Sequence, residues 1–264
     1  MNVQIGVRST DATTVDTSKR RVTRLPLPYK STTRPETEIA YPESDGEPMA
    51  ETDVHRDLMT DALLHPLKEY FRHRDDVYIS GNLFLYYEEG NRSAVVAPDV
   101  FVVFGVSNQQ RRIYKLWEEA KAPDIVFELT SNSTYRTDLS DKRLLYETLK
   151  VREYFLFDPL QDYLRPPLQG FRLVESYYLP VVPEPWDGGE WQIHSQVLDL
   201  TIRTDGPTLR LYDPTQERYL LNHAEEADAR RKEADARQAA EKRAEAAEAE
   251  LDRLRAMLDR QDVK

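Results

Sequence analysis

Two carboxylate residues lie in stretches of the chain that should be buried strands. Asp99 directly precedes the apolar run VFVVF (residues 100–104), and Glu128 interrupts a second apolar run, DIVFELT (residues 124–130). An unpaired charge is costly to bury, so each carboxylate needs a partner. If the two strands pair, both side chains can converge on one hard divalent cation such as Mg²⁺. Two structural alternatives stay open, in which Asp99 accepts a turn hydrogen bond after Pro98 and Glu128 pairs with a lysine or arginine.

The elements that must position these residues follow from hydrophobic periodicity. Thr52 is a candidate N-cap for a helix whose apolar residues continue to Phe71, interrupted at Pro66. Strand-like runs cover residues 77–80, 83–87, 100–104, 124–130 and 151–157, and Gly81-Asn82 predicts a hairpin between the first two. Helices are expected over residues 109–120 and 141–149, with a polar loop over 131–138. The expected order is therefore helix, hairpin, strand, strand, helix, strand.

Three regions follow from composition. Residues 1–38 are rich in Ser, Thr, Arg and Pro and predict a disordered basic arm; seven basic and two acidic residues lie between Met1 and Arg34. Residues 39–215 form the folded domain, in which short β segments between 163 and 212 extend the sheet or add a β-rich flap to it. Residues 216–264 predict an alanine- and charge-rich helix. A coiled-coil seam with spacings of four and three consists of Ala240, Ala244, Ala247, Leu251, Leu254 and Leu258. Self-association through this helix and an isolated helix held by charge pairs are both open.

Bulk composition excludes several classes of protein. The 264 residues contain no cysteine, which removes disulfides, thiolate metal sites and cysteine nucleophiles. No apolar run approaches the length of a membrane span, and no signal peptide is evident, so we expect no membrane partner and a cytoplasmic location. The net charge of −11 argues against a protein that holds nucleic acid by charge alone, although the basic arm could touch phosphate.

Four segments together resemble the Uma-two family of restriction endonucleases, formerly a domain of unknown function, in the PD-(D/E)XK nuclease superfamily. The segments are YPESDGEPMAETDVH (Tyr41–His55), VAPDVFVV (Val96–Val103), FELTSNSTYRTDLSDKRLLYE (Phe127–Glu147) and VREYFLFDP (Val151–Pro159). The resemblance covers roughly residues 40–215, and its specificity lies in the combination of motifs. It implies an α/β fold with a restriction-endonuclease-like mixed central sheet flanked by helices.

The resemblance also implies roles for individual residues. Asp99 and Glu128, with the carbonyl of Leu129, would bind Mg²⁺ or Mn²⁺ and hydrolyse phosphodiester bonds, with DNA as the substrate. The superfamily places a lysine two residues after the glutamate, where this chain has Thr130. Lys142 matches a lysine of the family's loop-helix motif and is the candidate replacement, with an ordinary surface lysine as the alternative. His55, Asp138 and Thr130 are candidate accessory residues.

Two rival functions compete with a Mg²⁺-dependent endodeoxyribonuclease. The absent lysine at position 130 and the overall acidity favour a nuclease-fold binding module without catalysis. The C-terminal helix favours a coiled-coil interaction protein whose globular part only positions that helix. Metal binding by the domain, and partner binding after deletion of the helix, would distinguish these classes.

Overall fold

The computed structural model describes residues 40–44 and 53–261, with side chains described as far as Arg253. The predicted basic arm, residues 1–38, lies outside the described residues, as do residues 45–52 of the first family-like segment.

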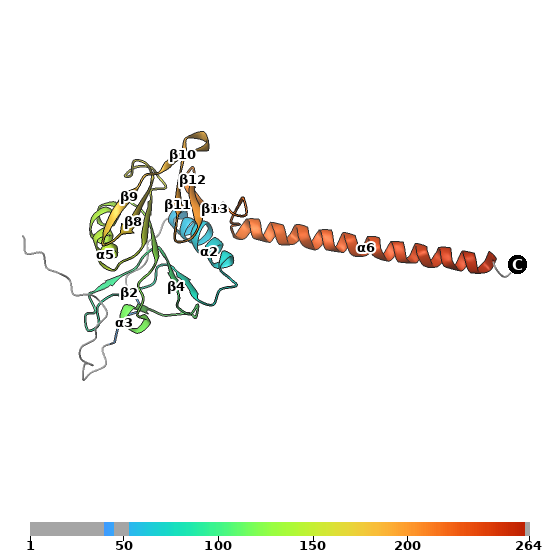
Figure 1. Ribbon diagram of the computed structural model, residues 1–264, viewed down its shortest axis with the longest axis horizontal. Coiled ribbons are helices and arrows are strands. Elements are labelled where there is room, and N and C mark those ends of the chain that lie inside the picture. Colours follow the sequence, from blue (N-terminus) through green and yellow to red (C-terminus); the bar gives the residue numbers. More distant parts are fainter. Residues whose placement is uncertain (1–39, 45–52, 262–264) are drawn as a thin grey trace, which may run out of the picture.

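The centre of the domain is a mixed six-stranded sheet, which confirms the predicted fold class (Figure 1). In spatial order its strands are β1 (Val77–Ser80), β4 (Val100–Phe104), β6 (Ile125–Leu129), β7 (Glu153–Phe157), β8 (Leu168–Val174) and β9 (Tyr177–Val181). β6 and β7 run parallel, and the other neighbours are antiparallel. The apolar runs predicted as strands therefore form the sheet, and β4, β6 and β7 are buried along almost their whole length.

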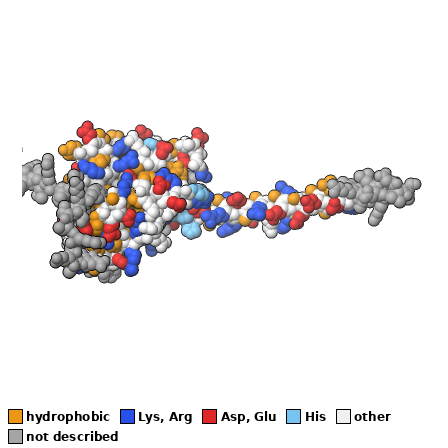
Figure 2. All heavy atoms as spheres, turned by 60° about the horizontal axis from the view of Figure 1, so that its bottom comes forward, with side chains coloured by type: hydrophobic (Ala, Val, Ile, Leu, Met, Phe, Trp, Pro, Cys, Tyr) orange, Lys and Arg blue, Asp and Glu red, His pale blue; other side chains and the backbone are white. Residues whose placement is uncertain are grey.

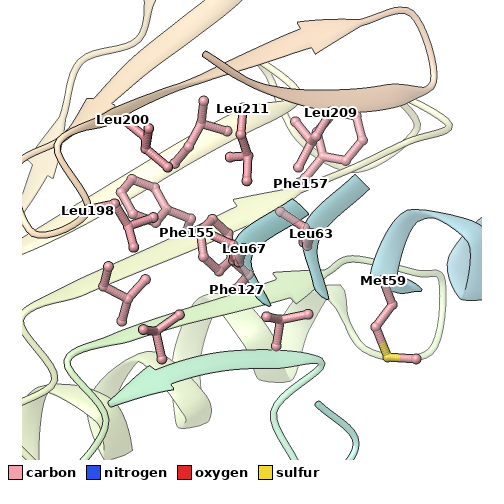
Figure 3. Packing of buried hydrophobic residues seen from close by; sticks show 14 of the residues in the cluster. Met59, Leu63, Leu67, Phe127, Phe155, Phe157, Leu198, Leu200, Leu209 and Leu211 are labelled. Carbon is pink, nitrogen blue, oxygen red and sulfur yellow. The ribbon is translucent and has the colours of Figure 1, made fainter. Parts of the chain in front are cut away.

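One face of this sheet packs against a helical segment and a second sheet (Figure 3). Leu63 and Leu67 of the helical segment and Leu200 of the second sheet share a core with Phe127 and Phe155 of the central sheet. The helical segment consists of α1 (Asp53–Asp57), the π-helix η2 (Leu58–Leu64) and α2 (His65–Tyr70). The strands of the second sheet are β10 (Glu184–Trp186), β11 (Glu190–Ser195), β12 (Leu200–Asp205), β13 (Thr208–Asp213) and β14 (Arg218–Tyr219). The short 3-10 helix η4 (Asp187–Gly189) connects β10 to β11.

The opposite face is covered by the connection between β6 and β7 and by a small sheet. Tyr146 of the connection and Leu85 of the small sheet pack in one core with Phe101 and Tyr154. The connection is helical and consists of α4 (Tyr135–Thr137), the π-helix η3 (Asp138–Lys142) and α5 (Arg143–Thr148). The small sheet has the order β3-β2-β5 and comprises β2 (Leu85–Tyr86), β3 (Val95–Val96) and β5 (Tyr114–Lys115), followed by α3 (Leu116–Glu119).

Three local predictions differ from the structure. The predicted Gly81-Asn82 hairpin does not form, because β1 pairs with β4 whereas β2 pairs with β3 and β5. Gly81 and Asn82 instead carry the chain from one sheet to the other, with Asn82 at a φ of 49°. The predicted helix over residues 109–120 is reduced to α3, since Tyr114 and Lys115 enter a strand. In addition, part of the predicted loop over 131–138 is helical from Tyr135 onward.

The helix α6 (His223–Gln261) leaves the domain as one continuous element of 39 residues (Figure 1). Its first turn is attached to the domain by ion pairs of Arg210 with Glu225 at 2.8 Å and of His65 with Glu226 at 2.9 Å. Beyond this turn the described side chains, from Ala227 to Arg253, are exposed. Figure 2 shows histidines at the root of the helix and acidic and basic side chains interspersed along it. In the described part of the chain no helix is both long and apolar enough to cross a bilayer.

Candidate metal and catalytic site

The pairing of β4 with β6 brings the two predicted carboxylates together. Val100 lies opposite Phe127 at the last paired position of this antiparallel pair, with Asp99 directly before Val100 and Glu128 directly after Phe127. Asp99 and Glu128 therefore lie at the same end of the β4–β6 pair, and the Oδ2 atom of Asp99 contacts the backbone N–H of Leu129, the residue after Glu128.

A glycine fixes the backbone at Asp99. A Cβ atom on Gly81 would lie 2.2 Å from the carbonyl oxygen of Asp99, so only glycine permits this close approach. The next residue, Asn82, donates its backbone N–H to the carbonyl of Pro98 at 2.9 Å. The segment between β1 and β2 therefore holds the Pro98-Asp99 turn against the end of β4.

Asp99 is hydrogen-bonded through both carboxylate oxygens. Its Oδ2 accepts the backbone N–H of Leu129 at 2.6 Å, and its Oδ1 lies 3.2 Å from Nε2 of His55. The hydrogen bonds of Asp99 therefore join it to the strand β6 and to the helix α1. His55, named as an accessory residue from the family resemblance alone, lies beside the carboxylate that it would orient.

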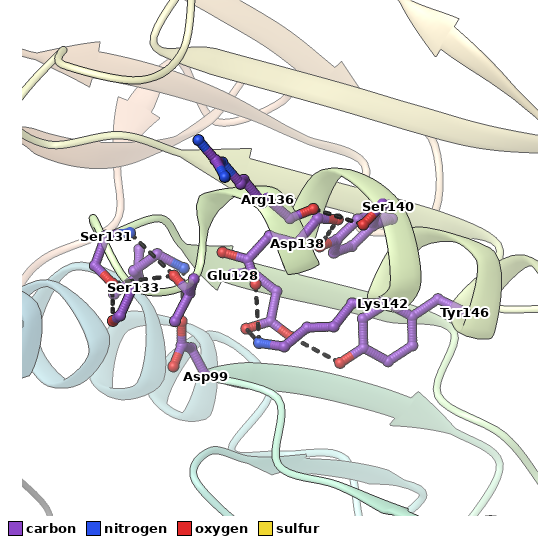
Figure 4. Close-up of polar contacts among 12 residues, drawn as sticks. Asp99, Glu128, Ser131, Ser133, Arg136, Asp138, Ser140, Lys142 and Tyr146 are labelled. Atoms are coloured by element: carbon purple, nitrogen blue, oxygen red, sulfur yellow. Dashed lines mark hydrogen bonds and ion pairs between the residues drawn. The ribbon is translucent and has the colours of Figure 1, made fainter.

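Glu128 is buried and binds two residues of the connection between β6 and β7 (Figure 4). Its Oε2 accepts a hydrogen bond from Nζ of Lys142 at 2.8 Å, and its Oε1 accepts the phenol O–H of Tyr146 at 2.7 Å. The alternative in which Glu128 pairs with a lysine is therefore realised in this structure. Tyr146 is not among the site residues predicted from the sequence, and no motif signalled its hydrogen bond to Glu128.

Lys142 is held between two buried carboxylates. Its Nζ also lies 3.0 Å from Oδ1 of Asp138, and both Glu128 and Asp138 have only 1% of their side-chain surface exposed. Asp138 and Lys142 are the first and last residues of the π-helix η3. π-helical turns are rare and occur frequently at functional sites. This π-helical turn places the carboxylate of Asp138 and the ammonium of Lys142 beside the buried Glu128.

Burial and like charges perturb the ionisation of this cluster. Burial raises the pKa of Glu128 to about 8, assisted by the nearby Asp99 and Asp138 and opposed by Lys142. Burial also raises the pKa of Asp138, again opposed by Lys142. For Lys142, burial lowers the pKa, but the carboxylates of Glu128 and Asp138 outweigh it and raise the pKa above its ordinary value. Lys142 therefore stays charged, and the cluster has more acidic groups than one ammonium can neutralise.

The oxygen atoms of this cluster are of the type that binds a hard cation, although they do not converge on a common point. Asp99, Glu128 and Asp138 supply carboxylate oxygens, the ligand type that Mg²⁺ prefers. Neither oxygen of Asp138 has a hydrogen bond of standard geometry to the described residues, and the same holds for the buried hydroxyl of Thr130. Within the described ranges, no three His, Cys, Asp or Glu side chains converge closely enough to form a metal cluster. The residues thus fit a divalent ion in chemistry, with Lys142 now occupying the space between two of the carboxylates.

Other acidic residues of the family-like segments have structural contacts. Glu153, buried in β7, binds Nε of Arg172 at 2.9 Å and the backbone N–H of Gln196 at 3.0 Å, and so joins the two sheets. Asp158 accepts the backbone N–H groups of Tyr163 and Leu164 at 2.6 and 2.9 Å and shapes the turn after β7. Neither contact involves the cluster around Glu128.

A family profile and a solved structure are similar to parts of the chain. A solved structure described as "a putative nuclease belonging to DUF820 from Anabaena variabilis" is similar to the chain, with 14% sequence identity and a TM-score of 0.38, over 51% of this chain and 70% of that one. No curated protein matches the chain. The sequence profile described as "Uma2: Putative restriction endonuclease" matches residues 24–205, which is more than half of the chain. The chain therefore belongs to the Uma2 family, the Uma-two family whose motifs its sequence resembles.

Proposed function

We propose that the protein is a divalent-metal-dependent endonuclease that hydrolyses phosphodiester bonds of DNA. The observation that carries this proposal is that Asp99 and Glu128 lie at the same end of the β4–β6 pair, with the ammonium of Lys142 bound to Glu128. Membership of the Uma2 family supports the reaction class. DNA as the substrate and Mg²⁺ or Mn²⁺ as the cofactor are part of the proposal.

Asp99 and Glu128, with the carbonyl of Leu129, are the residues that would hold the metal ion. When bound, a divalent ion lowers the pKa of coordinated water and neutralises the scissile phosphate. His55 contacts Oδ1 of Asp99 and fixes the orientation of that carboxylate. Because the pKa of Glu128 is about 8, this residue holds a proton at neutral pH in the metal-free site, and binding of a cation would displace that proton.

Lys142 would act through its charge. Its raised pKa keeps the side chain protonated at neutral pH, so it is unsuited to be a general base. A fixed ammonium stabilises negative charge that develops on the phosphate during attack by water. Asp138 positions this ammonium through the 3.0 Å ion pair. Thr130, which stands where related nucleases have lysine, supplies only a buried hydroxyl.

The test is cleavage of supercoiled plasmid DNA with Mg²⁺ and with Mn²⁺, run beside an Asp99→Ala variant. An exposed aspartate on the surface, Asp162, provides the control variant Asp162→Ala for contaminating nuclease. We expect nicked and linear products from the parent and from the control, and none from Asp99→Ala. Equal cleavage by all three proteins would contradict the assignment of Asp99.

A nuclease-fold binding module without catalysis is the second candidate function. Two observations favour it, namely threonine at position 130 and an ammonium of Lys142 already bound by two carboxylates. Calorimetry of metal binding and the plasmid assay separate the candidates. Metal binding that requires Asp99, with no cleavage by either ion, would favour the module.

We also propose that copies of the chain associate through α6. The exposed side chains of this helix and its seam of alanines and leucines support this role. The sequence of α6 and its attachment to the domain determine the orientation in which two such helices would pair.

A further inference from the structure

We infer that α6 pairs with α6 of a second copy as a parallel, in-register coiled coil, so that both domains lie at the same end. This inference rests on the proposed self-association and specifies its partner and orientation. Three features of the helix support it: the residues at which the apolar seam begins and ends, the charged residues beside the seam, and the contacts that attach the first turn of α6 to the domain.

The seam is confined to the distal part of α6. In heptad notation Ala240, Ala247 and Leu254 occupy d positions, and Ala244, Leu251 and Leu258 occupy a positions. Continuing the same frame toward the domain places Glu233 at d and Arg237 at a, where each would oppose its own charge in a parallel pair. The apolar contact therefore begins at Ala240, about 26 Å along the helix from His223 at 1.5 Å per residue.

The charges that flank the seam select the parallel orientation. In a parallel pair, each g residue faces the e residue five positions later in the second copy. Arg243 at g then faces Glu248 at e of the second copy, and Glu250 at g faces Arg255 at e. Both contacts join opposite charges, and the two-fold symmetry of the pair repeats each of them.

The antiparallel alternative loses this complementarity. Matching Ala240 with Leu258 and Ala247 with Leu251 of the second copy preserves the apolar layers. It also places Glu248 against Glu248 and Glu250 against Glu250 of the second copy, at the middle of the seam, and keeps opposite charges only where Glu241 faces Arg255. Like charges at such positions are destabilising, so the sequence of α6 disfavours this orientation.

Because the first turn of α6 is attached to the domain, the orientation of the helix pair determines where the two domains lie. The bidentate Arg210–Glu225 pair and the His65–Glu226 pair fix the direction in which the helix leaves the domain. The charged proximal segment separates the seam from the domain, so two domains can lie side by side without a shared interface. In the parallel dimer both domains, and therefore both Glu128 sites, lie at the same end of the helix pair.

The absence of cysteine allows a direct test with the full-length chain. A single cysteine introduced as Ala240→Cys would be the sole thiol of the molecule. In the parallel pair it faces its own copy and forms a disulfide on mild oxidation. In the antiparallel pair the two thiols are 18 residues apart, about 27 Å along the axis, which no disulfide can span. Ala249→Cys, on the outer face of the helix, is the matched control.

We expect rapid cross-linking of Ala240→Cys, little cross-linking of Ala249→Cys, and sedimentation of the parent toward twice the chain mass of 30.8 kDa as concentration rises. Arg243→Glu should weaken association roughly five- to tenfold, since two attractive pairs become repulsive, and adding Glu248→Arg should restore it. Cross-linking only in a mixture of Ala240→Cys with Leu258→Cys would overturn the parallel orientation.

A single-chain mass at every concentration, with no cross-linking of Ala240→Cys, would overturn the association itself. These measurements do not depend on nuclease activity. A protein that dimerises without cleaving DNA therefore contradicts only the proposed enzyme, and one that cleaves DNA as a monomer contradicts only this inference.

Discussion

Replacing Glu128 by glutamine removes its charge and leaves its shape almost unchanged. The carboxylate is buried and contacts Lys142 and Tyr146. The glutamine amide can keep both contacts, because its carbonyl accepts from Lys142 and its NH₂ group can donate to the phenol oxygen of Tyr146. The substitution therefore isolates the energetic effect of ionising one buried group.

The expected size of this effect follows from the pKa of Glu128. This pKa is raised from an ordinary value of 4.5 to about 8, so the folded state binds a proton that the unfolded state has released. The stabilisation is complete below pH 4.5 and is lost as the pH rises through 8. Linkage gives a loss of roughly 3–4 kcal/mol between pH 5 and pH 8 for this single group.

The assay is urea unfolding at pH 5 and pH 8, without divalent ions, for the parent and for Glu128→Gln. The unfolding free energy of the variant should fall by roughly 3–4 kcal/mol less than that of the parent over this range. Glu184→Gln, at an exposed glutamate of β10, is the control and should follow the parent. Identical pH dependence of the parent and Glu128→Gln would refute the reasoning, because Glu128 would then ionise freely in the folded state.

Three further predictions concern Lys142, Gly81 and α6. Lys142→Ala should lower cleavage by about 10²–10³, and should lower the unfolding free energy by roughly 3–5 kcal/mol by leaving two buried carboxylates without their cation. Lys142→Arg should restore little cleavage, and parental rates in both variants would reassign this lysine to structure. Gly81→Ala should lower the unfolding free energy by about 1–3 kcal/mol and weaken Mn²⁺ binding measured by calorimetry, since its Cβ would collide with the backbone of Asp99. An unchanged Mn²⁺ affinity would show that this backbone contact does not position the carboxylate. Removing residues 224–264 should leave a folded domain by circular dichroism, because the lost ion pairs of Glu225 and Glu226 contribute at most about 1 kcal/mol each. Failure of the truncated chain to fold would show that α6 is part of the core.

The central sheet could be predicted because its strands are continuous apolar runs. β4, β6 and β7 lie in segments that the sequence already marked as buried, and a carboxylate in such a run indicates a special site. The pairing of β1 could not be derived in the same way. Gly81-Asn82 has the composition of a tight turn, but the close approach of Gly81 to Asp99 imposed a different path on the chain.

The residues around Glu128 could be predicted only in part. The burial of Glu128 and the need for a cationic partner follow from its place in a strand, and Lys142 was identified through the family motif. Which lysine reaches the carboxylate depends on the π-helical turn η3, and local sequence gives no signal for such a turn. The contact between His55 and Asp99 joins residues 44 positions apart and depends on how α1 packs against the sheet.

The parallel pairing of β6 and β7 also has a consequence for the order of folding. Parallel neighbours need a crossover connection, and here the crossover carries Asp138, Lys142 and Tyr146 over Glu128. Antiparallel pairing of β4 with β6 can align Asp99 with Glu128 before the crossover is in place, whereas burial of Glu128 requires β7 to dock. Because the crossover supplies the residues that cover Glu128, we expect the carboxylate to become buried only when the crossover and β7 have docked. Uptake of a proton during refolding at neutral pH would then mark the completion of the sheet.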